Sequence, residues 1–142
     1  MKKVVFYKDK LVVEIPDYYE YSIEQNYSLI LFYSKNRSFT IKFIVVDSKE
    51  NSNQESFYDN KKLEKRFKTF SEEKYYSINN HVFEIDNKKL FVVSFEIIYK
   101  YYYINIRVNT LEELEMESKN NLIKHIDDMI LTIEENICWS ST

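Results

Sequence analysis

Residues 90–108 read LFVVSFEIIYKYYYINIRV and carry alternating apolar side chains on two consecutive segments. In the first segment the apolar residues stand at odd positions, from Phe91 to Tyr99, and in the second they stand at even positions, from Tyr102 to Val108. Successive side chains of a β-strand point to opposite faces, so a change of parity requires a turn between two strands. We therefore predict an antiparallel hairpin whose turn lies near residues 99–101.

This register also separates the three consecutive tyrosines. Tyr102 is expected on the core face, whereas Tyr101 and Tyr103 are expected on the opposite face together with Asn105 and Arg107. Tyrosine offers a large contact area at small conformational cost, so it is favoured in protein interfaces. The sequence predicts a protein-binding surface made of five residues: Tyr99, Lys100, Tyr101, Tyr103 and Arg107. Packing within the sheet and stacking of nucleic-acid bases remain the alternative roles of these rings.

Strand-like segments on both sides of the hairpin predict a larger antiparallel sheet. These segments are Val4–Phe6, Leu11–Ile15, Leu29–Tyr33, Phe39–Val46 and Val82–Ile85. Pro16 is expected to end the second of them, because proline lacks the amide that a sheet requires. Asn79, Asn80, Asp86 and Asn87 are expected in turns, and His81 is interpreted as a turn residue as well.

Two segments have the spacing of amphipathic helices. Ser52 and Glu55 form a capping signal before a shorter middle helix, whose apolar stripe continues to Phe70. Thr110 and Glu113 form a second signal before a long C-terminal helix, with the stripe Leu111, Leu114, Leu122, Ile126, Met129, Ile130, Ile133 and Ile137. Both stripes need an apolar partner, and the sheet supplies one. We therefore expect a single α+β domain over residues 1–142, an antiparallel sheet packed against both helices.

The composition excludes several kinds of site and partner. The 142 residues include no glycine, which rules out Walker loops, dinucleotide-binding glycine fingerprints and glycine-flanked nucleophile elbows. The formal net charge of −3 gives no overall attraction to phosphates, so we expect no nucleic-acid partner. One cysteine cannot form an internal disulfide, and apolar runs stay far below the roughly 20 residues of a membrane span. We expect a cytoplasmic protein without stable membrane insertion.

Groups with catalytic or metal-binding potential are few. Cys138, His125 and Asp127 offer a thiol, a base and an orienting carboxylate, but their spacing in the sequence says nothing about their mutual geometry. An acidic run suits the start of a helix, where carboxylates are favourable; it comprises Glu112, Glu113, Glu115 and Glu117. Asp127 and Asp128 are expected to face solvent. Without a metal or cofactor motif we expect no cofactor and no enzymatic activity, and a small hydrolase is the remaining enzymatic alternative.

The order of these segments resembles the PsbP-like fold family, which includes DcrB-like proteins and the Eag chaperones of type VI secretion. Three stretches carry the resemblance: KLVVEIPDYYEYS near the start, QESFYDNKKLEKRFKTF in the middle and NLIKHIDDMILTIEE at the end. The family's usual glycines are missing, and Tyr18 or Tyr19 stands where a tryptophan commonly follows the early proline. The resemblance implies a PsbP-like fold and a link to protein secretion.

A function is expected from these features together. A compact acidic chain with interface-forming tyrosines and no catalytic constellation is typical of a protein that covers a partner's surface, and negative charge speeds the capture of a basic partner. We expect a bacterial immunity protein that binds and neutralises a cognate secreted toxin. The alternative is an Eag-like chaperone that shields an apolar helix of a type VI effector.

Overall fold

Three long strands form the centre of the protein. The computed structural model describes residues 1–33, 39–47, 68–71, 74–110 and 116–136. Strands β7 (Lys74–Ile85), β8 (Lys88–Tyr99) and β9 (Tyr102–Thr110) follow one another as an antiparallel meander. Tyr99 pairs with Tyr102 across the second turn, which confirms the predicted change of parity. The predicted hairpin is therefore present, and its strands are longer than expected.

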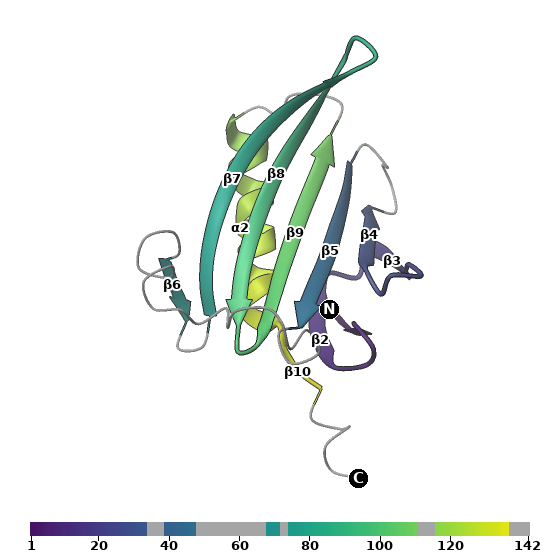
Figure 1. Cartoon of the computed structure of the whole chain (residues 1–142), viewed down its shortest axis with the longest axis vertical. Helices are drawn as coiled ribbons and strands as arrows, with labels where there is room; N and C mark the ends of the chain where they lie inside the picture. Colours follow the sequence, from purple (N-terminus) through teal and green to yellow (C-terminus); the bar gives the residue numbers. More distant parts are fainter. Residues whose placement is uncertain (34–38, 48–67, 72–73, 111–115, 137–142) are drawn as a thin grey trace.

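The meander belongs to a seven-stranded sheet with the order β3-β4-β5-β9-β8-β7-β6 (Figure 1). Beside β9 lie β5 (Phe39–Asp47), β4 (Leu29–Tyr33) and β3 (Tyr19–Ile23), and β6 (Lys68–Ser71) lies beside β7. The β4–β5 pair was predicted from its apolar pattern. Strand β3 was not, because only its first residue is buried and the others are exposed.

A second, three-stranded sheet contains both ends of the described chain. Its order is β1-β2-β10, with β1 (Lys2–Phe6), β2 (Leu11–Ile15) and β10 (Glu134–Glu135). The β1–β2 hairpin was predicted, and β2 ends just before Pro16 as expected. The addition of β10 to this hairpin was not predicted, since two glutamates do not resemble a strand.

Turns in this glycine-free chain place larger residues in the left-handed region of backbone space. The φ angles are 52° at Tyr7, 57° at Lys8 and 61° at Asp9 in the β1–β2 turn, and 54° at Lys100 in the β8–β9 turn. Left-handed geometry costs ordinary L-residues roughly 1–2 kcal/mol each. Asp86 and Asn87 have the paired positive φ angles, 51° and 65°, of a tight hairpin turn, as predicted.

Helix α2 (Met116–Thr132) lies along one face of the large sheet, behind β7, β8 and β9 (Figure 1). It buries the predicted residues Leu122, Ile126, Met129 and Ile130. The predicted helix was too long, because the described helix ends at Thr132 and the buried Ile133 follows it. Thr110 is the last residue of β9, while the rest of the predicted capping box lies outside the described residues.

The C-terminal end of α2 is held by two polar side chains. The Lys74 ammonium, on a side chain that is almost fully buried, donates to the Leu131 carbonyl oxygen at 3.0 Å. The Thr132 hydroxyl donates to the Met129 carbonyl and accepts from the Glu14 amide at 2.9 Å. These bonds satisfy carbonyls that the helix end leaves without partners, and a cation is favourable there.

The predicted middle helix is only partly testable. Residues 52–67 of that prediction lie outside the described residues, and its last part is wrong, because Lys68–Ser71 forms β6. Among the described residues α2 is the only helix. Asn79, Asn80 and His81 were also wrongly expected in a turn, since they lie within β7 and pair with β8.

The core lies between the α2-facing side of the large sheet, here named the inner face, and a layer formed by α2 and the β1–β2 hairpin. Phe6 of β1 meets Phe43 of β5 edge to face, with 5.8 Å between ring centroids. The fully buried side chains come from both sheets and the helix, and include Leu11, Ile15, Leu31, Ile41, Phe95, Ile97, Ile104, Ile106, Ile126 and Ile130. The opposite side of the large sheet is named the outer face.

Candidate functional site

The β8–β9 turn carries three of the five residues predicted to bind a partner, and it holds the end of the described chain. The Lys100 ammonium forms an ion pair with Glu135 at 2.6 Å, and the Tyr101 hydroxyl donates to the other oxygen of that carboxylate at 2.8 Å. The Glu135 amide donates to the Tyr99 hydroxyl at 3.2 Å. Tyr99, Lys100 and Tyr101 therefore bind β10 within the protein, through a contact that local sequence patterns do not reveal.

The rings of this turn pack in a tyrosine cluster made of Tyr7, Tyr99, Tyr101 and Tyr102. Tyr99 and Tyr102 stack with centroids 6.4 Å apart, and Tyr7 meets Tyr102 edge to face at 6.1 Å. Tyr102 is 2% exposed, so its predicted core position is confirmed. Tyr101 was expected on the opposite face, but its ring lies 4.7 Å from that of Tyr102 and packs partly buried against the core. It precedes β9, so the alternation of that strand does not govern it.

Tyr103 and Arg107 lie apart from this cluster, on the outer face. Tyr103 is half-buried between its cross-strand neighbours Val46 and Ile98. Arg107 is exposed, and its Nε donates to Asn105 Oδ1 at 2.8 Å. Asn105 in turn donates to the Ser94 hydroxyl at 3.1 Å. The structure therefore divides the five predicted residues into an internal group of three and an outer-face pair.

A protruding hairpin carries a cluster of exposed apolar side chains. Strand β9 ends opposite Phe91, so β7 and β8 continue beyond it as a two-stranded ribbon (Figure 1). Three large apolar side chains near its tip are at least half exposed: Val82 at 59%, Phe83 at 50% and Ile85 at 58%. Isolated two-stranded ribbons are marginally stable, and clustered exposed apolar side chains mark interaction sites. We name this feature the β7–β8 finger, residues 82–91.

The alternating pattern of residues 82–85 did predict a strand, but not its exposure. Exposure follows from the lengths of neighbouring strands, because the residues of the finger have no β9 partner to cover them beyond Phe91. An apolar strand looks the same in sequence whether its neighbour is present or absent. The sequence does not show that β7 and β8 extend beyond the end of β9, and this difference in strand length causes the exposure.

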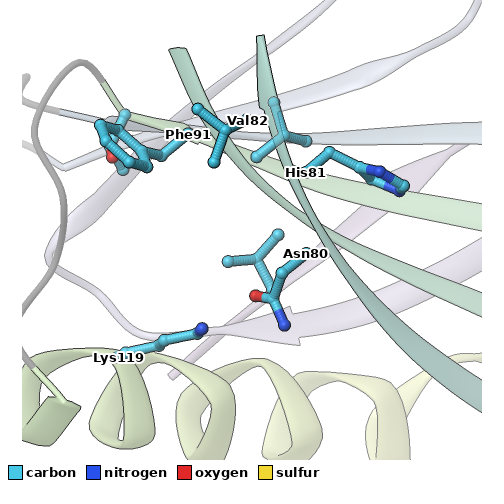
Figure 2. Close-up of a pocket in the computed structure, with 8 residues that line it drawn as sticks. Asn80, His81, Val82, Phe91 and Lys119 are labelled. Carbon is cyan, nitrogen blue, oxygen red and sulfur yellow. The ribbon is translucent and has the colours of Figure 1, made fainter. Parts of the chain in front are cut away.

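A small pocket lies where the finger joins the body of the protein (Figure 2). It has a volume of about 140 Å³ and lies between β7, β8, the end of β9 and α2. Val82, Phe91 and Val93 supply apolar walls. Asn80 and Lys119 reach into the same space from β7 and from α2, so polar groups stand on one side of an apolar pocket.

The groups considered for catalysis lie partly outside the described residues. His125 is exposed on α2, His81 is exposed on β7, and Cys138 lies outside the described residues. Of the acidic run, Glu117 is exposed in the first turn of α2, while Glu112, Glu113 and Glu115 lie outside the described part. No group of three or more potential metal ligands occurs among the described residues. Within those residues no helix is long and apolar enough to cross a membrane.

Asp127 differs from the expectation that it faces solvent. It is half-buried against Tyr76 of β7, and its Oδ1 atom has no hydrogen-bond partner among the described residues. Burial raises the pKa of the Asp127 carboxyl, a hydrogen bond with Tyr76 opposes this, and the Asp128 charge raises it further. Burial and the Asp127 charge also raise the pKa of Tyr76 to about 12. Asp128 itself is exposed, as predicted.

Solved structures of other proteins have a similar fold. The Ran-binding protein Mog1p of Saccharomyces cerevisiae matches with a TM-score of 0.58 and 9% sequence identity, over 95% of each chain. A mutant of Mog1 matches with the same TM-score and 10% identity over 94% of each chain. The chain shares the fold of Mog1. At this identity the similarity concerns the fold alone.

Two further structures are similar to this Mog1-like fold. A crystal structure from Bacteroides thetaiotaomicron matches with a TM-score of 0.63 and 8% identity, over 94% of this chain and 48% of the other, so this chain spans about half of that protein. A cyanobacterial PsbP from Synechocystis matches with a TM-score of 0.44 and 8% identity, over 94% of this chain and 91% of the other. No family model matches the sequence, and no curated protein matches it significantly.

Proposed function

We propose that this protein is a non-enzymatic protein-binding domain, and that its biological role is that of a bacterial immunity protein that neutralises a cognate toxin. The observation that carries the proposal is the β7–β8 finger, where Val82, Phe83 and Ile85 are half exposed or more. Large apolar side chains at the end of a ribbon gain most when a partner covers them, at about 25 cal/mol per Å² of apolar surface removed from water.

Fold and charge give further support. Mog1p, which has the same fold, is a Ran-binding protein, so the fold serves protein recognition in at least one other chain. The net charge of −3 favours a basic partner, because complementary charge raises association rates. Tyr103 and Arg107 on the outer face remain the predicted contributors from the β8–β9 segment, since Tyr99, Lys100 and Tyr101 already bind Glu135.

The experiment uses the candidate toxin encoded beside the gene. Co-expression measures protection of growth, and titration of the purified proteins measures affinity. The double variant Phe83→Ser/Ile85→Ser removes apolar surface from the finger, and we expect at least a tenfold loss of affinity with loss of protection. The matched control is Tyr21→Ser/Ile23→Ser on β3, whose side chains are 48% and 44% exposed at the other edge of the sheet.

Both double variants change exposed residues, so we expect each substitution to alter the free energy of unfolding by less than about 0.5 kcal/mol. If the finger variant binds the toxin as tightly as the wild-type protein does, the finger is not part of the binding site. Absence of binding and protection by the wild-type protein would reject the immunity role.

An Eag-like chaperone is the second candidate, favoured by the same exposed apolar residues. A chaperone of this class shields an apolar helix of an effector, so it binds a hydrophobic N-terminal segment and not a folded toxin domain. Titration with each part of the effector separates the two roles. Binding that is confined to the hydrophobic segment, without protection from the toxin domain, supports the chaperone.

A further inference from the structure

The free edge of β7 is the starting point for a more specific inference. Strand β6 pairs with β7 only at Lys74, Tyr75 and Tyr76. Residues 77–85 pair with β8 on one side, and no described strand pairs with them on the other. Their register with β8 is continuous, without a bulge. Along these nine residues, the backbone amides and carbonyls of alternate residues point away from β8 and are offered to an added strand.

Within the described part of the chain, this edge has little of the usual protection. Natural edge strands are blocked by lysine, proline, bulges or covering segments. The sequence of the edge is SINNHVFEI, with neither lysine nor proline, and its residues 80–85 are all exposed. Glu84 is its only charged side chain, so the exposed residues 80–85 are a template for another strand.

The pocket beside the edge indicates which side chain an added strand places there. Side chains alternate along β7, so Asn80 and Val82 point toward the pocket on the inner face, whereas Phe83 and Ile85 point to the outer face. A strand added to β7 alternates in the same way and places every second side chain beside the pocket. At about 140 Å³ the pocket is small compared with the roughly 300–1,000 Å³ of small-molecule sites, and it suits a single side chain.

The charge around the pocket defines the partner further. Lys119 reaches into it from α2 and forms no ion pair with any described residue (Figure 2). The apolar walls of Val82, Phe91 and Val93 suit an aliphatic or aromatic side chain. A carboxylate two residues away on the added strand lies on the same face and complements Lys119.

We propose that β7 receives an extended segment of the protein partner as an additional edge strand, with an apolar side chain in the pocket and an acidic side chain paired with Lys119. The proposal rests on the protein-binding function and specifies its mode. Backbone hydrogen bonds supply affinity, and the pocket and Lys119 supply specificity. On the outer face, Phe83 and Ile85 contact the alternate side chains of the same segment.

A second copy of this chain fits the site less well. Symmetric antiparallel pairing of two β7 edges around His81, the midpoint of residues 77–85, places Val82 opposite Asn80. In that arrangement the carboxylate of the second copy's Glu84 falls opposite Ile78, which does not line the pocket with Lys119. The partner segment is therefore expected to come from another protein.

The test uses a phage-displayed library of random dodecapeptides selected on the whole wild-type protein. We expect enriched peptides to combine an apolar and an acidic residue at alternate positions. Synthetic copies are titrated against Lys119→Glu and against the matched control Lys124→Glu, an exposed lysine on the same helix. Lys119→Glu is expected to weaken binding at least tenfold and Lys124→Glu less than twofold, with thermal unfolding recorded for each variant.

Amide hydrogen exchange supplies a readout that needs no substitution. Binding of the enriched peptide is expected to slow exchange at alternate amides of residues 77–85 and not in β3, the opposite edge. Failure to enrich peptides, equal binding to Lys119→Glu, or exchange that is unchanged along β7 would overturn the proposal. A wild-type dimer whose formation protects the same amides would also overturn it and assign the edge to a second copy.

These outcomes are independent of the toxin experiment. Enriched peptides that require Lys119, together with a toxin that does not bind, retain the strand-addition site and reject the immunity role. A toxin that binds the wild-type protein and the Lys119→Glu variant equally well retains the protein-binding function and rejects the strand-addition site.

Discussion

Replacing Tyr102 with alanine tests the division between core and surface tyrosines most directly. Tyr102 is 2% exposed and contacts three other rings, those of Tyr7, Tyr99 and Tyr101. Truncation of a buried aromatic side chain to alanine costs about 3–5 kcal/mol, because transfer free energy is lost and a cavity remains. We expect a loss of about 3–4 kcal/mol, since the edge position of the cluster permits some collapse.

Replacing Tyr103, on the outer face, with alanine provides the comparison. Tyr103 is half-buried, so Tyr103→Ala is expected to cost less than about 1.5 kcal/mol, half of the value for a fully buried large apolar side chain. Urea denaturation measures both differences, and thermal unfolding gives a second measure. At this chain length about 3–4 °C of melting temperature corresponds to 1 kcal/mol, so Tyr102→Ala is expected to melt roughly 10–15 °C lower. Equal losses for the two variants would refute the assignment of Tyr102 to the core.

Two further predictions concern charged groups. Glu135→Gln removes the ion pair with Lys100 and is expected to lower the free energy of unfolding by about 0.5–1 kcal/mol, and by less at high salt because the pair is partly exposed. The control is Glu134→Gln, which changes an exposed glutamate beside it. Equal effects of the two variants in urea denaturation would contradict the role of Glu135. Asp127→Asn is expected to raise the melting temperature at pH 7. Burial raises the folded-state pKa of Asp127 above 3.8, so folding favours the neutral carboxyl. The resulting contribution to stability is present below pH 3.8 and is lost as pH rises through the folded-state pKa. The gain from Asp127→Asn should therefore shrink as the pH falls toward 3.8, and a gain that does not depend on pH would contradict this cause.

The strands with alternating apolar residues were predictable because one face of each strand lines the core. The odd positions from Val93 to Tyr99 and the even positions from Tyr102 to Val108 line the core, and this period-two alternation appears in the sequence and fixes the β8–β9 register. Strands β3 and β10 were missed because most of their side chains remain exposed or form polar contacts. The end of the predicted middle helix was wrong because the three-residue spacing of Phe67 and Phe70 in the sequence fits a helix, and short segments do not decide between helix and strand.

The predicted faces of the tyrosines are correct only where they depended on local alternation. Tyr102 and Tyr103 were assigned correctly to opposite faces, because both lie inside β9. Tyr101 was not, since its position depends on Glu135, which arrives from a distant part of the chain. The finger and the pocket depend on unequal strand lengths and on the position of α2, and neither has a signature in the local sequence.

Pairing between β2 and β10 has a consequence for how the protein is made. Val12 is synthesised about 120 residues before its partner Glu134. At a synthesis rate of about 5–20 residues per second, the first hairpin waits on the order of ten seconds for α2 and β10. Its apolar residues Val4, Phe6 and Val13 have no helix to cover them in that interval. The nascent chain therefore carries an uncovered apolar segment until α2 and β10 have been synthesised, and we expect it to be prone to aggregation in that interval.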